Sequence, residues 1–376
     1  MRKITKAVLT LGVGGALLAS VAGAALADPP SGVTPAHTDI VGAGSDTTQQ
    51  VLDQLSTDYN GQSPAPANKL YSFDAVGSSS ITTKTGCASI TRPNGSGAGI
   101  TALKANAQPS GDTTDYCIDF ARSSRGPQAG DGTGIAFVAF AQDAVTWSAT
   151  STTAKPTHAT TSLTDAQLKA IYSCDASQLG TGKTGPVTWN EVGGTSTDAV
   201  VPVIPQSNSG TRAFFLSAIG NPTLGSCVQG TDNSVEENEG TNAIFSGSNS
   251  PDIVFPYSVA VYLAQSQNGH GTGTQGNQVL RSGQTTSGTV VAPTVGTAPN
   301  LTLNPALATV GLTRYVYNVV RNTGSAPYVP TYLQGIFGAG NDTGYVCTNA
   351  TAQADITSYG FRSLGSNCGA VTIPTS

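Results

Sequence analysis

The chain has 376 residues, of which 17 are basic and 22 acidic, and its formal net charge is −5 at pH 7. This balance argues against nucleic acid or an anionic membrane surface as a partner. Hydrophobic residues make up 38% of the sequence, enough for a core, and the length predicts about two domains. Only 10% of the residues are charged, so Ser, Thr, Asn and Gln must supply the polar surface.

A targeting segment opens the chain. Basic residues over 2–6 precede a small, apolar run over 7–27, and Ala25-Leu26-Ala27 matches a small-x-small cleavage site. The alternative is a membrane helix, because the run approaches the length needed to span a bilayer. Its Gly and Ala content and the Asp-Pro-Pro that follows favour cleavage after Ala27. We therefore expect a secreted protein, extracellular or periplasmic, without a lipid anchor because no Cys stands at the cleavage point.

Six cysteines are spread over the chain, and none lies in a CxxC pair, so zinc spacing is absent. Export makes disulfides the default, although six cysteines allow 15 pairings. Pairing between sequence neighbours is favoured because each bridge would close a loop inside one domain and leave hinge motion free. The pairs expected on this basis are Cys87–Cys117, Cys174–Cys227 and Cys347–Cys368.

The first half of the chain alternates predicted strands and helices. In order, we predict a strand tail over 39–41, a helix from a cap at Ser45 or Asp46 to about residue 60, a strand over 70–76, a short helix over 99–107, a strand over 116–121, and one or two strands buried on both faces over the apolar run 135–147.

The second half continues the alternation after a Ser/Thr-rich linker over 150–161. We predict a helix after the capping box Thr164-x-x-Gln167, a strand over 199–204, a helix after Ser209, a strand-turn-helix unit over 253–264, a loop-like region over 265–300, a strand over 312–321 and a helix over 328–338. Such alternation is typical of α/β folds with mainly parallel sheets, which bind ligands at strand ends beside helix N-termini.

Three joints rich in Ser, Gly and Thr precede predicted helices, at 42–48 (GAGSDTT), 95–100 (GSGAGI) and 205–219 (PQSNSGTRAFFLSAI). The first N–H groups of a helix have no partner inside it and lie at the positive end of its dipole. With hydroxyl groups beside them they form an anion site. We predict that the three joints converge on one small anion. The alternative for each joint is an ordinary cap or turn.

The order of these motifs resembles a known family. GAGSDTTQQVL, GSGAGI, DFARSSR, LTDAQLKAIY with VTWN, and SNSGTRAFF recur as in phosphate-type substrate-binding proteins of ABC importers. VTWN at 187–190 is the most specific marker, followed by Ser-Gly-Thr at 209–211, and the resemblance is weakest over 77–95 and 265–300. It implies a type II periplasmic-binding-protein fold, in which two α/β lobes joined by two crossing strands hold the ligand in a cleft.

The resemblance also implies lobe boundaries and binding residues. Lobe I would comprise 38–142 and 312–376, lobe II would comprise 143–311, and the crossings would fall near 143–147 and 311–315. Carried over by position, the ligand-binding residues would be Ser45, Asp46, Thr47, Ser96, Gly97, Ser123, Ser124, Ser209, Gly210 and Thr211.

Two positions depart from the family. Ser124 stands where phosphate binders carry an Asp that accepts the ligand's proton, and Pro205 stands where many carry an Arg. Asp46 is a candidate to restore the acceptor, and it is equally a candidate helix cap. Arg122, Arg125 and Arg212 are candidates to supply the charge, since Arg binds tetrahedral oxyanions through bidentate hydrogen bonds. Arg122 and Arg212 complete the predicted site.

Other motifs carry no chemistry that we can assign. The GxGxxG match at 271–276 has no clear helix after it and is interpreted as a loop. His37, His158 and His270 lie in polar stretches without an HExxH pattern, and GxSxG is absent. We therefore expect no metal, no cofactor and no catalytic residues.

The leading hypothesis is a secreted, monomeric solute-binding protein that captures a small oxyanion, with phosphate favoured, and delivers it to an ABC permease. It is expected to be neither an enzyme nor a nucleic-acid binder. The alternative is a secreted interaction or surface protein that keeps the fold with altered or lost ligand specificity, which Ser124, Pro205 and the missing lipid anchor support. A hydrolase ranks lower because no activated nucleophile is visible.

Overall fold

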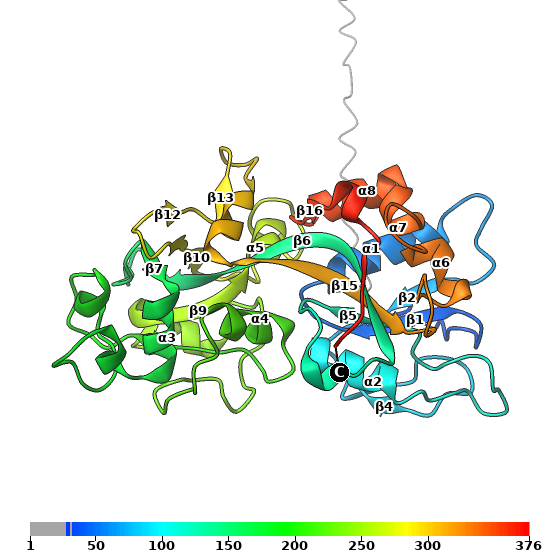
Figure 1. The fold of residues 1–376 in the computed structure, drawn as a ribbon, viewed down its shortest axis with the longest axis horizontal. Helices are drawn as coiled ribbons and strands as arrows, with labels where there is room; N and C mark the ends of the chain where they lie inside the picture. Colours follow the sequence, from blue (N-terminus) through cyan, green and yellow to red (C-terminus); the bar gives the residue numbers. More distant parts are fainter. Residues whose placement is uncertain (1–27, 31, 376) are drawn as a thin grey trace, which may run out of the picture.

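The computed structural model describes residues 28–30 and 32–375, so the predicted signal peptide and its cleavage site lie outside the described residues. Two lobes lie side by side, and two long strands, β6 (Ile135–Thr150) and β15 (Thr313–Arg321), run from one to the other (Figure 1). Within the described part of the chain, no helix combines the length and the apolar character that a membrane span requires.

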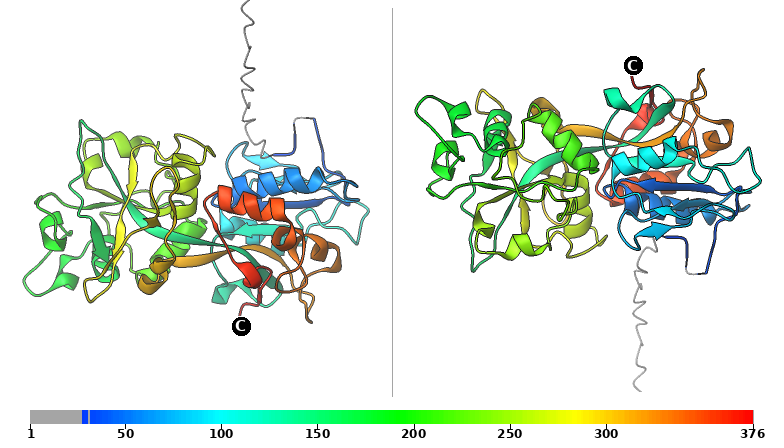
Figure 2. Two further views of the ribbon diagram at one scale, coloured as in Figure 1. Left: turned by 90° about the horizontal axis from the view of Figure 1, so that it is seen from above. Right: turned by 90° about the horizontal axis from the view of Figure 1, so that it is seen from below.

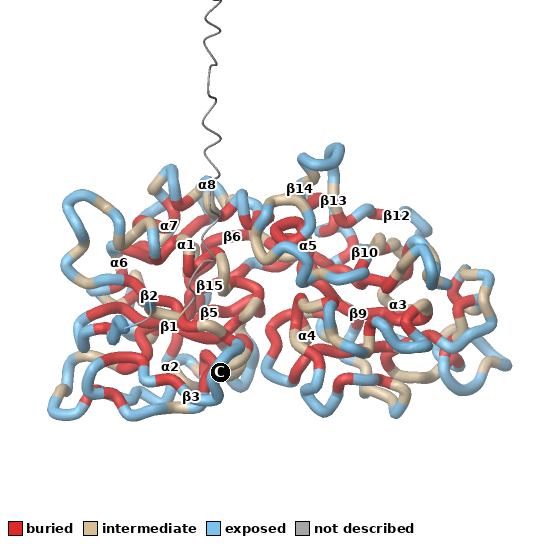
Figure 3. Tube along the Cα trace, turned by 180° about the vertical axis from the view of Figure 1, so that it is seen from behind, coloured by how far each residue is buried: buried red, intermediate tan, exposed pale blue. Residues whose placement is uncertain are grey.

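The apolar run at 135–147 folds as part of β6. β6 is a single strand of 16 residues, and almost all of them are buried. β15 pairs with it antiparallel from Thr313 opposite Ala144 to Arg321 opposite Ile135, with an irregularity between Val316 and Tyr317. The chain thus enters lobe II through β6 and returns to lobe I through β15, and both strands are red, that is buried, along most of their length in Figure 3.

The main sheet runs through both lobes in the order β2-β1-β5-β15-β6-β9-β8. Its other strands are β1 (Ile40–Gly44), β2 (Leu70–Ser72), β5 (Phe120–Ser123), β8 (Val201–Pro202) and β9 (Ile253–Ser258). Pairs at the two ends are parallel, whereas the pairs that involve β6 or β15 are antiparallel. The two-lobed α/β fold is therefore confirmed, but the sheet is mixed, because its central strands carry the chain between the lobes in opposite directions.

Helices cover both faces of the lobe I part of the sheet. The helices of this lobe are α1 (Gln49–Asn60), α2 (Ser96–Lys104), α6 (Thr331–Phe337), α7 (Tyr345–Thr348) and α8 (Ala350–Ser358). Seen from above, α8 and α1 lie in front of the sheet, and seen from below, α2 does (Figure 2). Because side chains alternate along a strand, Val138 and Phe140 of β6 join the core under α1 and α8, whereas Phe137 joins the core under α2.

Lobe II is built around β9 and the far half of β6. Its helices are α3 (Asp165–Ser173), α4 (Gly210–Ala218) and α5 (Val259–Ser266). Trp147 and Trp189 stack in its core with ring centroids 6.5 Å apart, and the Trp189 indole donates to Asp252 over 2.9 Å. The predicted VTWN marker thus belongs to the packing of this lobe.

Short strands complete both lobes. They are β3 (Ser80–Ile81), β4 (Ile90–Thr91), β7 (Ser162–Thr164), β10 (Gln278–Leu280), β11 (Ser282–Gln284), β12 (Val290–Val291), β13 (Thr294–Val295), β14 (Thr302–Leu303), β16 (Arg362–Ser363) and β17 (Val371–Thr372). The loop-like interpretation of 265–300 was therefore wrong in part, because β10 and β11 form by pairing with the distant strands β6 and β7.

The predictions of helix caps and of disulfide pairs can be compared with the structure. The capping box at Thr164 and Gln167 is confirmed, and so are all three predicted disulfides. The predicted cap of α1 at Ser45 or Asp46 is wrong, since α1 begins at Gln49 after Thr48 and has no side-chain cap. Ser45 instead directs its hydroxyl to Ser124, across the top of the sheet.

Candidate functional site

The N-terminus of α4 is positioned by local sequence. β8 ends at Pro202, a turn follows, and Ser209 caps α4 by accepting a hydrogen bond from the Arg212 N–H over 2.9 Å. Phe215 is fully buried one turn further on and fixes the helix against the core of lobe II. The first turn of α4 consequently faces lobe I.

Three serines of lobe I meet opposite this helix. Ser45 follows β1, Ser124 follows β5 and Ser96 begins α2. The Ser45 hydroxyl donates to the Ser124 hydroxyl over 2.9 Å, and the Ser124 N–H donates to Ser96 Oγ over 3.0 Å. All three side chains are buried, so the carboxyl ends of β1 and β5 and the start of α2 share one polar spot.

The two lobes touch at this spot. Thr47 Oγ1 of lobe I lies 3.0 Å from Thr211 Oγ1 of α4. Gly210 packs so closely against lobe I that a Cβ there would overlap the hydroxyl oxygens of Ser96 and Ser124. We name the five residues Ser45, Thr47, Ser96, Ser124 and Thr211 the hydroxyl cluster. It brings residues from all three predicted joints together between the lobes.

Arg314 adds a cation that the sequence analysis missed. It lies on β15 directly opposite Asp143 of β6, and its Nε and Nη2 donate to Asp143 Oδ2 over 3.0 and 2.7 Å. Its Nη2 also donates to Thr211 Oγ1 over 3.0 Å. Arg314 Nη1 is buried without a hydrogen-bond partner among the described residues. The crossing strands thus place a guanidinium against the hydroxyl cluster.

The arginines predicted from sequence lie elsewhere. Arg122 is fully buried inside lobe I, where its guanidinium donates to the carbonyls of Ser45 and Phe73 and to the Ser72 hydroxyl. Arg212 donates to the Pro205 carbonyl, within its own turn. The structure therefore does not bring these two side chains into the hydroxyl cluster, and Arg122 instead supports the backbone at Ser45 from behind.

Two further predicted residues differ in orientation. Ser123 donates its hydroxyl to the Arg125 carbonyl, away from its neighbour Ser124, as strand alternation requires. The Gly97 N–H, one of the predicted donors, is already bonded to the Asn208 carbonyl of lobe II over 3.1 Å. The N-terminus of α2 is thus partly satisfied by lobe II itself.

A carboxylate occupies the N-terminus of α4. Glu237 Oε2 accepts hydrogen bonds from the Ser209 hydroxyl over 2.5 Å and from the Thr211 N–H over 3.1 Å. The side chain is 1% exposed, and Glu237 Oε1 is buried without a partner among the described residues. Two of the donors predicted to hold an external anion therefore hold an acidic side chain of the same lobe.

The neighbours of Glu237 reach across the cleft. Glu236 accepts both of its hydrogen bonds from the Asn94 amide of lobe I over 3.0 Å, and the Asn238 amide donates to Thr47 Oγ1 over 3.0 Å. We name residues 236–238 the acidic segment. It connects the lobes while it covers α4.

Asp46 lies beside this segment, where it accepts a hydrogen bond from the Asn238 amide over 3.4 Å. The pKa of Asp46 is raised to about 8, mainly by burial and in smaller part by the negative charge of Glu237. An ordinary carboxyl group would be ionised at neutral pH, but Asp46 holds its proton there. It can therefore act as a hydrogen-bond donor in the cleft.

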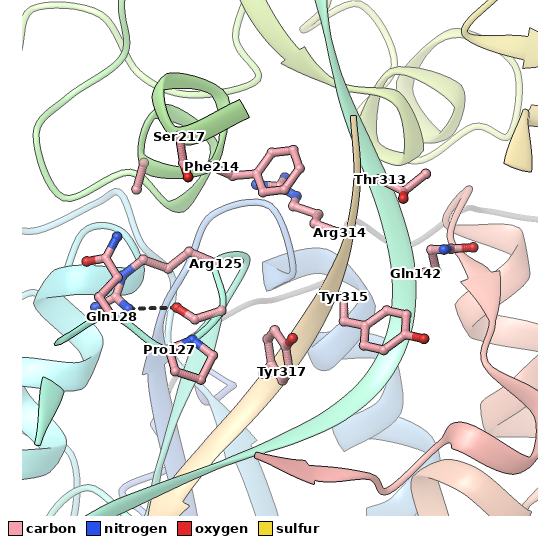
Figure 4. A pocket seen from close by; sticks show the side chains of 12 residues that line it. Arg125, Pro127, Gln128, Gln142, Phe214, Ser217, Thr313, Arg314, Tyr315 and Tyr317 are labelled. Carbon is pink, nitrogen blue, oxygen red and sulfur yellow. Dashed lines mark hydrogen bonds between the residues drawn. The ribbon is translucent and has the colours of Figure 1, made fainter. Parts of the chain in front are cut away.

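Two cavities flank the hydroxyl cluster. The smaller, about 120 Å³, is lined by Asp46, Glu237 and a mixture of other polar and apolar residues. The larger, about 530 Å³, lies between α4 and the loop after β5, with β15 as its wall (Figure 4). Its lining includes Arg125, Phe214, Arg314, Tyr315 and Tyr317. Arg125 is paired with Asp131 at 2.7 Å and Arg314 with Asp143, so the acidic partners offset the two cations.

Two histidines lie near carboxylates outside the cleft. His158 Nδ1 is 2.8 Å from Asp252 Oδ1 and 3.2 Å from Asp198 Oδ2, and His37 stands near Asp112 and Asp115. In the group around His158, Asp252 also accepts a hydrogen bond from the Trp189 indole, so the packing of the lobe II core explains where Asp252 lies.

The site residues that were not predicted differ in how clearly the sequence indicates them. Glu236, Glu237 and Glu239 form the densest acidic run in a chain that is only 10% charged, and this run was a usable signal. Arg314 lies within the predicted crossing at 311–315, but only the pairing of β15 with β6 shows that it meets Asp143 and α4.

The chain is similar to known proteins over most of its length. The pattern of a PBP superfamily domain matches residues 29–355. No curated protein matches the chain. Among solved structures, an ABC-type phosphate transport receptor from Vibrio cholerae is 18% identical, with a TM-score of 0.50 over 86% of this chain and 99% of the receptor. A putative phosphate ABC transporter substrate-binding protein from Clostridium perfringens, solved with bound phosphate, is 14% identical, with a TM-score of 0.51 over 87% and 99% of the two chains. At these identities the likeness concerns the fold.

Proposed function

Because the chain belongs to the PBP superfamily, we propose that it is a secreted, monomeric solute-binding protein that captures a small oxyanion between its lobes. Phosphate is the favoured ligand, since both solved structures named above are described as phosphate transport proteins. An ABC permease at the membrane would receive the ligand. The role is binding rather than catalysis.

The observation that carries this proposal is the hydroxyl cluster. The hydroxyl groups of Ser45 and Ser96 lie within hydrogen-bond distance of the Ser124 hydroxyl in lobe I, and Thr47 reaches Thr211 of α4 across the lobes. Arg314 donates to the same Thr211 hydroxyl. A hydroxyl or guanidinium group that bonds to an ionised ligand contributes about 1.5–3 kcal/mol. Several such bonds, less the cost of closing the lobes, reach the roughly 8 kcal/mol of micromolar affinity.

Capture would couple to lobe closure. Ser45, Thr47, Ser96 and Ser124 belong to lobe I, whereas Thr211 and the first turn of α4 belong to lobe II. An oxyanion that contacts both sets stabilises the closed arrangement more than the open one. β6 and β15 are the strands about which the lobes would move.

The second candidate is a secreted interaction or surface protein that keeps the fold with altered or lost ligand specificity. The Glu237 carboxylate favours it, because a negative charge on α4 opposes a negative ligand there. The two candidates differ in one measurable property, which is whether inorganic oxyanions bind at all.

Isothermal titration of the mature protein with phosphate, sulfate and arsenate tests the proposal. We expect phosphate to bind and Thr211→Val to weaken the affinity about tenfold, because the variant loses a hydroxyl that faces both Thr47 and Arg314. Thr133→Val is the matched control, since Thr133 is exposed on lobe I. If none of the three anions gives a heat of binding, the interaction or surface protein becomes the better-supported function.

A further inference from the structure

Glu237 stands where the proposed ligand would stand. A helix N-terminus attracts anions because its first N–H groups lack internal partners. In α4 the Thr211 N–H and the Ser209 hydroxyl both donate a hydrogen bond to the same carboxylate oxygen of Glu237. The backbone N–H of Glu237 is itself held by the Gln206 side chain over 2.9 Å, which fixes the residue over the helix. The Glu237 carboxylate thus occupies the N-terminus of α4 in the way that an external anion would.

The second carboxylate oxygen shows that this arrangement is not a fully satisfied structural contact. Glu237 Oε1 is buried, and none of the described residues donates a hydrogen bond to it. Burying an acceptor without a partner costs about 1–3 kcal/mol, and more for a charged group. A side chain selected only to cap α4 would not need to bury this oxygen unpaired.

We propose that Glu237 is an internal competitor for the ligand, and that an oxyanion reaches Ser209 and Thr211 only by displacing its carboxylate. This inference rests on the proposed function. Two negative charges cannot share the same two donors, so binding of the ligand and docking of Glu237 exclude each other. Glu237 thereby weakens the apparent affinity for the ligand by the fraction of molecules in which its carboxylate is displaced.

The surroundings give the displaced side chain a route. Glu237 also lines the smaller cavity of about 120 Å³, on the side of Asp46 and Gln265. Its neighbours Glu236 and Asn238 hold Asn94 and Thr47 of lobe I. Movement of Glu237 into that cavity would strain these two interlobe contacts, so that exchange of the internal for the external anion is linked to the relative position of the lobes.

The test compares Glu237→Ala with Glu236→Gln. Glu237→Ala vacates α4, whereas Glu236→Gln removes one charge from the same segment and keeps an oxygen that accepts from Asn94. By isothermal titration we expect Glu237→Ala to bind phosphate at least about tenfold more tightly than the unmodified protein, and Glu236→Gln to stay within about threefold. Equal affinity of all three proteins would overturn the inference and leave the proposed function intact.

Formate provides a readout that does not depend on phosphate. It is a small carboxylate that restores to Glu237→Ala the group that was removed. We expect formate to raise the melting temperature of Glu237→Ala and to leave that of the unmodified protein unchanged. If phosphate binds none of the proteins, the proposed function and the competitor role both fail, and stabilisation of Glu237→Ala by formate then shows only that the N-terminus of α4 accepts a carboxylate.

Failure of formate to stabilise Glu237→Ala, together with unchanged phosphate affinity, contradicts the inference. Glu237→Gln decides the matter if the Ala variant does not fold, because the amide oxygen can still accept from Ser209 and Thr211. With the charge gone, Glu237→Gln should bind phosphate at least about threefold more tightly than Glu236→Gln, and no difference between the two would refute the competitor role.

Discussion

At the scale of the residue, the pKa of one carboxyl group in the cleft lies far above its usual value. Asp46 stands between the hydroxyl cluster and the acidic segment, and its pKa is raised from 3.8 to about 8, first by burial and then by the charge of Glu237. The folded protein therefore holds a proton at Asp46 that the unfolded chain releases above about pH 4. The contribution of this group to stability is fully present below that pH and is lost as the pH rises through about 8.

Asp46→Asn tests this at the residue scale. Asn does not titrate, so the variant should lose less melting temperature between pH 5 and pH 8 than the unmodified protein does. Asp232→Asn is the control, because hydrogen bonds from Ser234 lower the pKa of that exposed carboxyl group and it stays ionised throughout the range. Parallel pH profiles of the Asp46→Asn variant and the unmodified protein would contradict the raised pKa.

At the scale of elements, the approach of α4 to α2 and β5 decides whether the cleft can close. Gly210 is the first residue of α4, and it lies against the hydroxyl groups of Ser96 and Ser124. Only hydrogen fits there, since a Cβ would overlap both oxygens. The helix N-terminus can therefore reach lobe I only because this residue has no side chain.

Gly210→Ala should hold the lobes apart without unfolding either of them. We expect a larger radius of gyration by small-angle X-ray scattering and at least about a tenfold loss of oxyanion affinity, with a melting temperature near that of the unmodified protein. Gly335→Ala is the matched control, because a Cβ at this helical glycine of α6 meets no atom within 4 Å apart from the nearby backbone of its own helix. An unchanged radius for Gly210→Ala would show that closure does not depend on this contact.

At the scale of the whole molecule, the two crossing strands hold a buried ion pair between the lobes. Arg314 and Asp143 are opposite each other on β15 and β6, and both side chains are buried. Asp143 also accepts from the Ser258 hydroxyl over 2.8 Å and from the Ala260 N–H over 3.1 Å, at the start of α5. One carboxylate thus joins both crossing strands to a helix of lobe II.

Asp143→Ala should lower the free energy of unfolding by about 3–5 kcal/mol, because it leaves the Arg314 guanidinium buried without its partner. The double variant Asp143→Ala/Arg314→Met should recover part of that loss, since no lone buried charge remains. Urea unfolding of the three proteins measures both effects. A double variant less stable than Asp143→Ala would mean that Arg314 stabilises the fold through other contacts.

Much of the architecture was predictable because its signals are local. The continuous apolar run of β6, the capping box at Thr164, the Ser209 cap of α4 and the three disulfides each depend on residues close in sequence or on simple pairing. The short strands β10 and β11 were missed, since each forms by pairing with a strand more than 100 residues away.

The candidate site divides in the same way. The sequence by itself determined which joints carry hydroxyl groups and free helix N–H groups, because those depend on a few consecutive residues at a strand-to-helix turn. Only the tertiary structure decided what those groups meet. It buried Arg122 behind Ser45, brought Arg314 to Thr211 and set Glu237 on α4. The reason is physical: contacts between the lobes depend on how two separately formed surfaces dock, and no local pattern encodes that arrangement.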